Sequence, residues 1–173
     1  MAEPPTTTAA PSLPSFGDGQ QIVGQDIQPG VYRTEGAGGF NCYFQRLKGL
    51  SGEFGDIITN GNSTGPVIVE IAATDVAFDS NGCKDWIAFL GAPVIDSFGD
   101  GDWAVGSQLS AGRWSTDGDP SSVNCYWERD RGFTHTFGDI VANNNTNGKT
   151  TVEIRSKDVR FTSDGCGTWR KVG

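Results

Sequence analysis

The chain contains one sequence pattern written twice, and this repetition constrains its fold more than any other feature. Phe16-Gly17-Asp18-Gly19 recurs as Phe98-Gly99-Asp100-Gly101, an offset of 82 residues. After a one-residue insertion the offset becomes 83, and Asn41-Cys42-Tyr43 recurs as Asn124-Cys125-Tyr126. The matches keep the same order over about 75 residues, a period too long for a solenoid unit. The sequence therefore predicts two homologous domains in tandem.

The repeat divides the 173 residues into four parts. Residues 1–15 are rich in Pro, Thr and Ala, which bury little apolar surface, so we expect an extended, disordered tether. Residues 16–90 and 98–173 are the two predicted β domains. The linker, residues 91–97, is short and contains the apolar pair Val94-Ile95, so we expect the domains to pack together instead of swinging freely.

Each repeat holds two cysteines that are 41 residues apart. Because each repeat is a self-contained unit, we predict the pairs Cys42–Cys83 and Cys125–Cys166 among the three possible pairings. On the chain-entropy model, closing a loop of about 40 residues stabilises a domain by about 4 kcal/mol. Zinc sites usually need closely spaced ligands, so a metal site is the weaker alternative, and free buried thiols are the other. Disulfides persist outside the reducing cytoplasm, which predicts a secreted or cell-surface protein.

Short stretches of alternating polarity predict strands, and no segment has apolar residues at helical spacing over ten or more positions. In the first repeat the expected strands lie at residues 31–34, 42–47, 57–58 and 67–72. In the strand after these, Val76 and Phe78 are expected to point inward. The Asn- and Gly-rich segments 60–65 and 143–148 are expected to be loops. Five or six short strands per repeat indicate an all-β fold of two small antiparallel β-sandwich or barrel domains, and the pattern does not choose between these.

Charge and hydropathy exclude some partners. The formal net charge is −8, and an acidic protein repels a phosphate backbone, so we expect no nucleic-acid partner. No apolar run reaches the roughly 18 residues that span a bilayer. Residues 1–15 lack the basic and apolar regions of a signal peptide and look like the spacer that follows a cleaved signal or a lipid-modified cysteine. We therefore expect contact with a membrane only through a lipid anchor that precedes residue 1.

Few residues offer catalytic chemistry. His135 is the one histidine and is expected to be a solvent-facing loop residue, which leaves no Ser–His or Cys–His pair. Glu70 and Glu153 are duplicated carboxylates, but each is expected on the outer face of a strand in a different domain. For Asp18 and Asp100, a turn in which aspartate bonds its own backbone is favoured over calcium binding. We expect no enzyme, no cofactor and no metal.

Three residues are candidates for ligand binding. Trp103 has Gln21 as its counterpart in the first repeat. Its indole is either an exposed platform for a sugar ring or peptide or, as we slightly prefer, part of the contact between the domains. Asn62 and Asn145 lie in the two Asn-rich segments and are the other candidates.

The absence of catalytic groups favours a non-catalytic binding protein for an extracellular glycan, cell-wall component or protein, with avidity from the two copies. The alternative is a structural or adhesive surface or virion component acting through protein–protein contacts, or an enzyme inhibitor.

A set of short motifs runs through the first repeat in a fixed order: Val23-Gly24, Ile27, Pro29-Gly30-Val31-Tyr32, Asn41-Cys42-Tyr43, Arg46, Asp56-Ile57-Ile58, Asp75, Phe78, Gly82-Cys83 and Trp86. With these motifs the chain resembles a family of repeated domains in secreted proteins and lipoproteins of actinobacteria. The resemblance covers the chain outside the N-terminal tether. The second repeat departs from it with Leu109 in place of Ile27 and Ala111 in place of Pro29. The family has no settled activity, so the resemblance implies location and modularity and not chemistry.

Overall fold

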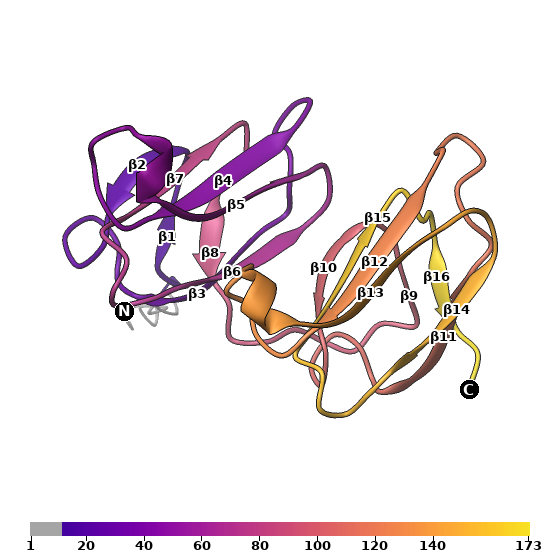
Figure 1. The fold of residues 1–173 in the computed structure, drawn as a ribbon. Coiled ribbons are helices and arrows are strands. Elements are labelled where there is room, and N and C mark those ends of the chain that lie inside the picture. The colour runs from indigo at the N-terminus through magenta and orange to yellow at the C-terminus, as the bar shows by residue number, and fades with distance from the viewer. Residues whose placement is uncertain (1–11) are drawn as a thin grey trace, which may run out of the picture.

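The computed structural model describes residues 12–173, which form two similar all-β domains lying next to each other (Figure 1). The strands of domain one are β1 (Ser15–Phe16), β2 (Gly19–Ile22), β3 (Gly30–Thr34), β4 (Cys42–Leu47), β5 (Ile57–Ser63), β6 (Val67–Ile71), β7 (Ala77–Asn81) and β8 (Trp86–Ala88). Those of domain two are β9 (Ser97–Phe98), β10 (Gly101–Ala104), β11 (Gly112–Thr116), β12 (Cys125–Asp130), β13 (Ile140–Thr146), β14 (Thr150–Ile154), β15 (Arg160–Asp164) and β16 (Trp169–Lys171). Short 3-10 helices, η1 (Phe54–Asp56) and η2 (Phe137–Asp139), precede β5 and β13.

Each domain is a sandwich of two four-stranded antiparallel sheets. In domain one the strand orders are β1-β8-β3-β6 and β2-β7-β4-β5. Domain two repeats them as β9-β16-β11-β14 and β10-β15-β12-β13. The core of domain one takes Tyr32 and Val69 from the first sheet and Phe44 and Phe78 from the second. Since the core lies between two separate sheets, the sandwich is the correct choice between the two predicted architectures. The structure has more strands than the five or six predicted, because several contain only two or three residues.

A buried tryptophan anchors each core at the same position of the repeat. Trp86 meets the ring of Phe78 edge-on with centroids 5.0 Å apart, and Trp169 meets Phe161 in the same way at 5.2 Å. The indole N–H of Trp86 donates to the hydroxyl of Ser80 at 3.1 Å, so its polar atom is satisfied inside the core. The repeated tryptophans Trp86 and Trp169 therefore serve packing in both domains.

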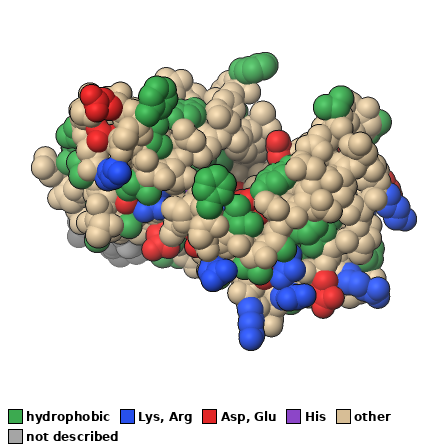
Figure 2. All heavy atoms as spheres, viewed as in Figure 1, with side chains coloured by type: hydrophobic (Ala, Val, Ile, Leu, Met, Phe, Trp, Pro, Cys, Tyr) green, Lys and Arg blue, Asp and Glu red, His purple; other side chains and the backbone are tan. Residues whose placement is uncertain are grey.

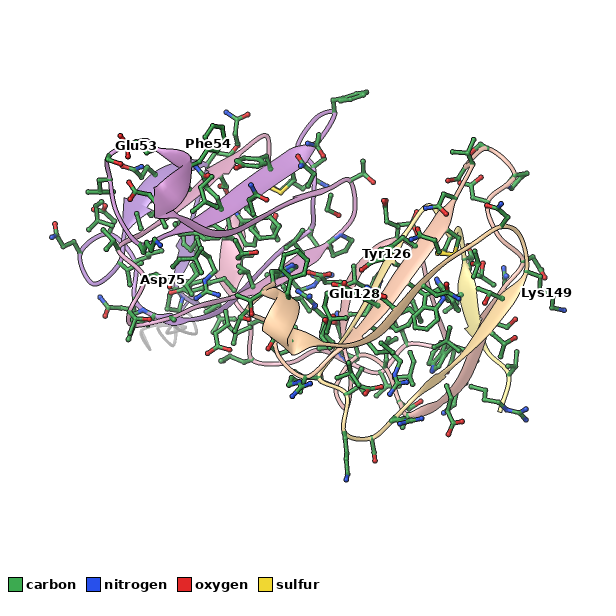
Figure 3. The ribbon with its side chains drawn as sticks, in the orientation of Figure 1. Glu53, Phe54, Asp75, Tyr126, Glu128 and Lys149 are labelled. Atoms are coloured by element: carbon green, nitrogen blue, oxygen red, sulfur yellow. A yellow bond between two sulfur atoms is a disulfide. The ribbon has the colours of Figure 1, made fainter. Side chains whose placement is uncertain are left out.

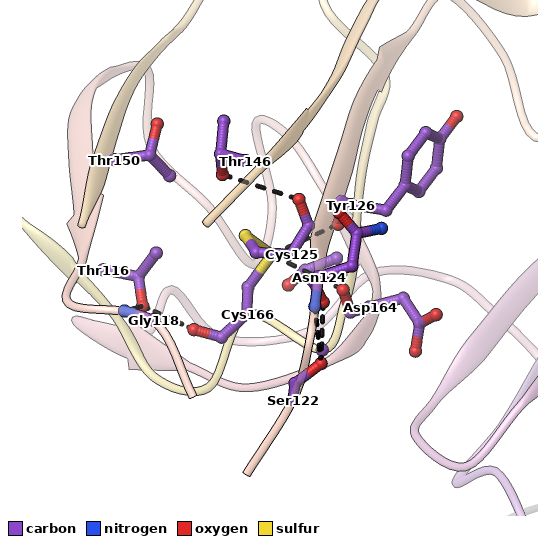
Figure 4. The surroundings of a disulfide bond; sticks show 12 residues. Thr116, Gly118, Ser122, Asn124, Cys125, Tyr126, Thr146, Thr150, Asp164 and Cys166 are labelled. Atoms are coloured by element: carbon purple, nitrogen blue, oxygen red, sulfur yellow. Dashed lines mark hydrogen bonds between the residues drawn. A yellow bond between two sulfur atoms is a disulfide. The ribbon is translucent and has the colours of Figure 1, made fainter. Parts of the chain in front are cut away.

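Both predicted disulfides are confirmed: Cys42 is bonded to Cys83 and Cys125 to Cys166. Figure 4 shows the second bond, beside which the Thr116 hydroxyl donates to the Cys166 carbonyl at 2.6 Å. Each disulfide joins the first residue of a strand of one sheet, β4 or β12, to the loop that leads to the other sheet. The covalent bond therefore ties the two layers of each sandwich together.

The aspartates of the two Phe-Gly-Asp-Gly turns hold the loops that carry these cysteines. Asp18 accepts hydrogen bonds from the Ser80 hydroxyl and the Cys83 amide. Asp100 accepts the equivalent bond from the Cys166 amide at 3.0 Å. The expectation that each aspartate bonds its own turn is therefore corrected, because the partner is a loop more than 60 residues away in sequence. Within residues 12–173 no group of three or more His, Cys, Asp or Glu side chains is arranged to hold a metal ion.

A buried ion pair also recurs in each domain. Arg46 Nε lies 2.7 Å from Asp75 Oδ2, and Arg129 Nε lies 2.6 Å from Asp158 Oδ2. Each arginine is on the strand that begins with a disulfide cysteine, and each aspartate lies in the turn before β7 or β15. The pair therefore fixes that turn against the sheet, with the charges compensated inside the protein.

The Asn-rich segments are strands over most of their length, which corrects the prediction that they are loops. Asn60 to Ser63 pair with β4, and Asn143 to Thr146 pair with β12. β5 and β13 are the outer strands of their sheets. At such an edge the backbone groups are used by one neighbour while polar side chains face solvent, so low β-propensity is tolerated.

Three smaller expectations also change. Val76 is exposed, because it lies in the turn before β7, whereas Phe78 is buried as predicted. Ser15, assigned to the tether, begins β1 and pairs with Ile87. Ser97, assigned to the linker, begins β9 and pairs with Arg170. Pro14 also contacts domain one, since its carbonyl accepts from the Ala88 amide at 2.8 Å, and residues 1–11 of the predicted tether lie outside the described residues. In the part of the chain that the structure describes, no helix is long and apolar enough to cross a bilayer.

Candidate functional site

Domain two covers the free edge of β6, the outermost strand of its sheet in domain one. The Asp102 amide donates to the Pro66 carbonyl at 2.7 Å, and the Ile68 amide donates to the Asp102 carboxylate at 2.9 Å. Further along the strand, the Glu70 amide donates to the Phe133 carbonyl at 2.8 Å. These bonds satisfy backbone groups that an edge strand would leave open. They hold the two domains in one defined arrangement.

Two glycines make this contact close. A Cβ on Gly65 would lie 2.2 Å from the Asp100 carbonyl oxygen, and one on Gly101 would lie 2.7 Å from Pro66. Gly101 also has a φ of +118°, which favours glycine. By contrast, Val94 of the linker is exposed and Ile95 packs against the core of domain two. The packing of the domains is therefore made by β6 and β10 and not by the apolar linker residues.

His135 lies inside this junction, which corrects the expectation of a solvent-facing loop residue. Its side chain is only 14% exposed. Nε2 is 3.0 Å from the Ile68 carbonyl oxygen and 3.1 Å from Asp102 Oδ2, and the ring meets Phe44 edge-on at 4.9 Å. Its φ of +58° makes it the one non-glycine residue with left-handed backbone among residues 12–173. The loop that carries His135 projects from its own domain, but domain one covers it.

Behind His135 lies a buried charge cluster, which we call the Arg160 cluster: Arg160, Asp102, Glu128 and Asp130. Arg160 Nε donates to Asp130 at 3.1 Å and Nη2 donates to Glu128 at 3.1 Å. Nη1 is 3.7 Å from Asp102 and has no hydrogen-bond partner. One guanidinium therefore faces three carboxyl groups, with one donor atom unused.

The cluster shifts the pKa of its members in opposite directions. Burial, the largest effect, and the nearby Glu128 and Asp102 charges together raise the pKa of Asp130 to about 7 against the opposing effect of Arg160. For Asp102, burial acts the same way, but Arg160 and His135 outweigh it and hold the pKa well below its usual range. Asp102 is therefore ionised at neutral pH, while Asp130 exchanges its proton there.

Two residues of the Arg160 cluster, Arg160 and Glu128, line a cleft of about 460 Å³ between the domains, which we call the inter-domain cleft. It is lined by Ile57, Ile58, Thr59, Asn60, Tyr126, Glu128, His135, Thr136, Phe137, Ile140 and Arg160. Figure 3 shows Tyr126 and Glu128 on β12 at the side of the cleft, and Figure 2 shows the hollow between the domains with hydrophobic side chains at its edge. The Tyr126 hydroxyl donates to Glu128 at 2.5 Å. Burial and Glu128 raise the pKa of Tyr126 to about 12, so its hydroxyl stays protonated.

Domain one has a cavity of about 400 Å³ on the corresponding face, but its chemistry is different. Tyr43 and Gln45 occupy the positions of Tyr126 and Glu128. The other members of the Arg160 cluster and His135 are replaced by neutral residues: Gln20 for Asp102, Leu47 for Asp130, Gly52 for His135 and Ala77 for Arg160. The two domains thus share a concave face and differ in its charge.

One residue at this face is kept in both domains and is exposed in both. Phe54 on η1 is 93% exposed and Phe137 on η2 is 95% exposed. Each lines the cavity of its own domain. No residue of η1 or η2 is buried, so these rings contribute little to folding. Phe54-Gly55-Asp56 recurs in the sequence as Phe137-Gly138-Asp139. Repetition alone does not distinguish a core residue from an exposed one.

The three ligand-binding candidates from the sequence are not brought together. Trp103 is half-buried, packs beside Phe98 with ring centroids 5.5 Å apart and donates its N–H to the Gly99 carbonyl. Asn62 and Asn145 are exposed, one in each domain. Asn62 accepts a side-chain hydrogen bond from Asn41, just before β4, and Asn145 accepts one from Asn124, just before β12. The residue next to Trp103, Asp102, is the one that reaches domain one. A ligand-binding role for these three residues stays a prediction.

The comparisons with known proteins agree with the duplication. Residues 14–87 and 96–170 each match the Rv1352-like extracellular domain. Relatives include the uncharacterized protein Rv1352 of Mycobacterium tuberculosis (strain ATCC 25618 / H37Rv) and the uncharacterized protein Mb1387 of Mycobacterium bovis. Each is 36% identical over 83 residues, which cover 41% of this chain and 68% of the relative. No solved structure matches the chain significantly.

These matches confirm the resemblance to actinobacterial domains, and with the two disulfides they place the protein outside the cytoplasm. The chain belongs to the Rv1352-like extracellular domain family, of which it carries two tandem copies.

Proposed function

We propose that this extracellular protein is a non-catalytic binding protein whose ligand occupies the inter-domain cleft against Phe137, with Phe54 providing a second contact on domain one. The observation that carries the proposal is the pair of phenylalanines, which are almost fully exposed at the same position of both domains. Each ring stands at the mouth of a concave surface. Aromatic side chains gain most from burial, so an exposed ring kept in both copies fits a surface that becomes covered by a ligand.

Binding fits the cleft better than catalysis because its acid–base groups are already engaged. His135 Nε2 is held between Asp102 and the Ile68 carbonyl. The two oxygens of Glu128 accept hydrogen bonds from Tyr126 and Arg160. A general acid or base needs an open position within hydrogen-bond reach of the substrate. These side chains instead fix the wall of the cleft.

The presence of two such faces favours a repetitive target, such as a glycan, a cell-wall polymer or an array of protein subunits. When two weak contacts belong to one rigid body, the second contact forms at a high effective concentration. The domains are held rigidly by the backbone hydrogen bonds to β6. Loss of one ring should then weaken binding, and loss of both should weaken it far more.

The test is retention of the purified protein on insoluble actinobacterial cell envelopes. We expect Phe137→Ser to lower the affinity by about tenfold, and the double variant with Phe54→Ser to abolish retention. Val172→Ser, an exposed apolar residue outside the described cavities, is the matched control. Both phenylalanines are exposed, so circular dichroism should be unchanged in all variants. Retention of the double variant at the level of the control would refute the proposal.

A structural role through protein–protein contacts is the second candidate, and one observation favours it. Phe40 and Val123 occupy the same position in the loops before β4 and β12, and they are 97% and 94% exposed. Apolar side chains at corresponding tips of both domains would suit a protein surface. Analytical ultracentrifugation tests this role: a defined oligomer that dissociates in Phe40→Ser would support it, and a monomer at all concentrations would count against self-assembly.

A further inference from the structure

We infer that the outer face of the sheet β9-β16-β11-β14 in domain two binds a linear acidic polysaccharide. Three arginines define this surface, which we call the basic face: Arg113 on β11, Arg170 on β16 and Arg155 directly after β14. None of the three lines the inter-domain cleft. The basic face is therefore a second site, and it binds or fails to bind independently of the function proposed for the cleft.

The charges of the chain are divided unequally between the two domains. Residues 12–96 contain four Lys and Arg against ten Asp and Glu, whereas residues 97–173 contain nine against ten. Figure 2 shows Lys and Arg side chains gathered over the lower part of domain two. Because salt screens a charge beyond about 8 Å at physiological ionic strength, a ligand on the basic face responds to the local charges and not to the net charge of the whole chain.

The strand register places the three arginines in one straight file. On β11, Arg113 and Ser115 lie on the face away from the core. Ser115 pairs with Arg170, and Arg113 pairs with Glu153, two residues before Arg155. Arg170 and Arg155 are thus the diagonal neighbours of Arg113 on its two sides, each about 7–8 Å away. A single extended chain laid diagonally across the sheet meets all three.

The three guanidinium groups are available to an anionic ligand. All three arginines are exposed, and among residues 12–173 they form no ion pair. Their counterparts in domain one are Val31, Ala72 and Ile87. The fold therefore does not require arginine at these positions, and the charges are a property of the second copy alone.

The local charge stays positive after the neighbouring residues are counted. Glu153 lies opposite Arg113 on the same face and offsets one charge. Lys149, just before β14, and Lys157, in the turn after it, are exposed and add two positive charges. A ligand with several carboxylates in a row is the complement of such a file, because a guanidinium binds a carboxylate through strong, charge-assisted hydrogen bonds.

Hydroxyl groups beside the file favour a sugar chain as the carrier of these carboxylates. Ser97 pairs with Arg170, and Thr151 pairs with Ser115 on the same face. The Thr151 hydroxyl donates to Ser115 Oγ at 3.0 Å, and the Ser115 hydroxyl donates to the Thr150 carbonyl at 3.0 Å. Both hydroxyl oxygens keep a lone pair for a further donor, such as a sugar hydroxyl next to a bound carboxylate.

Other anionic partners find less to contact on this face. The aromatic residues of the four strands, Phe98, Trp114 and Trp169, are buried. Nucleic-acid bases therefore lack rings on which to stack, and a protein partner lacks the aromatic anchors that dominate protein interfaces. Val172 is exposed just after β16, but a single apolar side chain inserts little into a bilayer.

The experiment is isothermal titration calorimetry of the full chain. The acidic probes are hexamers of galacturonate and of mannuronate, and a neutral hexamer of glucose tests the need for charge. Hexathymidylate, hexaglutamate and phosphatidylglycerol vesicles represent nucleic acid, acidic protein and membrane. The arginine variant combines Arg113→Gln, Arg155→Gln and Arg170→Gln. Its matched control removes three positive charges from exposed positions elsewhere: Lys48→Gln, Lys84→Gln and Arg131→Gln.

We expect both acidic hexamers to bind, with an affinity that falls as salt rises from about 20 to 300 mM, and the glucose hexamer to fail. The arginine variant should bind the acidic hexamers at least about tenfold more weakly, whereas the control variant should stay within about twofold of the parent. Val172→Ser changes no charge and should match the parent. All substituted residues are exposed, so circular dichroism should be unchanged.

The assignment is wrong if neither acidic hexamer binds, or if the arginine variant and the control variant lose affinity equally. It is also wrong if hexathymidylate, hexaglutamate or the vesicles bind more tightly than the acidic hexamers. Phe137→Ser leaves the basic face intact and should bind the hexamers normally. Retention of Phe137→Ser on cell envelopes tests the cleft separately, so failure at one site is distinguished from failure at the other.

Discussion

Replacing Asp102 by alanine should weaken the protein more than almost any other single change, because four groups from both domains converge on this carboxylate. It accepts hydrogen bonds from the Ile68 amide at 2.9 Å and the Thr162 hydroxyl at 2.6 Å. His135 Nε2 lies at 3.1 Å and Arg160 Nη1 at 3.7 Å. In Asp102→Ala the Ile68 amide and the Thr162 hydroxyl would lose their acceptor, whereas His135 would keep the Ile68 carbonyl and Arg160 would keep Asp130 and Glu128.

The expected loss in free energy of unfolding is about 4 kcal/mol. Arg160 keeps two carboxyl partners in this variant, so its buried charge stays compensated and the loss comes mainly from the two donors that only Asp102 satisfies. Each orphaned neutral donor adds about 1–3 kcal/mol unless the structure relaxes or water enters. Because Ile68 lies in the other domain, separation of the domains relieves part of this cost. Asp102→Asn keeps the shape and one acceptor oxygen, so its loss should be about half as large.

The repeat supplies a matched control at the same position. Gln20 is the domain-one counterpart of Asp102, lies on β2 at the position of β10, and is exposed. Gln20→Ala should change the free energy of unfolding by less than about 0.5 kcal/mol. The comparison separates the effect of the buried carboxylate from the effect of a substitution on this strand.

Urea denaturation followed by tryptophan fluorescence measures the difference directly. Trp86 is the one tryptophan of domain one, and the other four of the five are in domain two, so the signal reports mainly on the domain that holds the cluster. Fits should assume two-state unfolding only if fluorescence and circular dichroism coincide. A loss below about 1 kcal/mol in Asp102→Ala, or a loss equal to that of Gln20→Ala, would refute the reasoning.

Three further changes test other parts of the structure. Because the pKa of Asp130 is raised to about 7, the folded state holds this proton more tightly than the unfolded chain. Stability should therefore fall as pH rises from about 4 to 7, by at most about 4 kcal/mol. Asp130→Asn should remove most of the change of the urea midpoint with pH over that range. An unchanged pH dependence of the midpoint would contradict the assignment. Removing the bond between Cys125 and Cys166 by a double change to alanine should lower the free energy of unfolding by about 4 kcal/mol on the chain-entropy model; equal urea midpoints would contradict it. Gly65→Ala should force the domains apart and speed hydrogen exchange of the β6 amides, whereas Gly55→Ala, with open space around its Cβ, should not. Equal exchange in the two variants would show that the contact is not tight.

The covalent framework and the fold class follow from the sequence because they depend on local or repeated features. Equal spacing of Cys42–Cys83 and Cys125–Cys166 selected the correct disulfides. Alternating polarity identified the main strands, since it reflects burial of one face. It missed the strands of two or three residues, such as β1, which are too short to show a period.

The inter-domain cleft could not be predicted in the same way. His135 pairs with Ile68, 67 residues earlier in the chain, and no periodicity reports such a contact. A usable signal was present in the differences between the copies. His135 replaces Gly52, and Arg160 replaces Ala77. When two copies share a fold, charged residues found in only one of them mark where that copy has acquired a separate role.

The contact of domain two with β6 also makes the two copies unequal. The side chains that reach β6, Asp102 and His135, belong to domain two, whereas domain one offers Gln20 and Gly52 at those places. If the domains exchanged roles in this contact, these two residues would lie against the edge of β14, without a carboxylate or an imidazole to meet it. The two domains therefore have different roles in their contact, and the copies are no longer interchangeable modules.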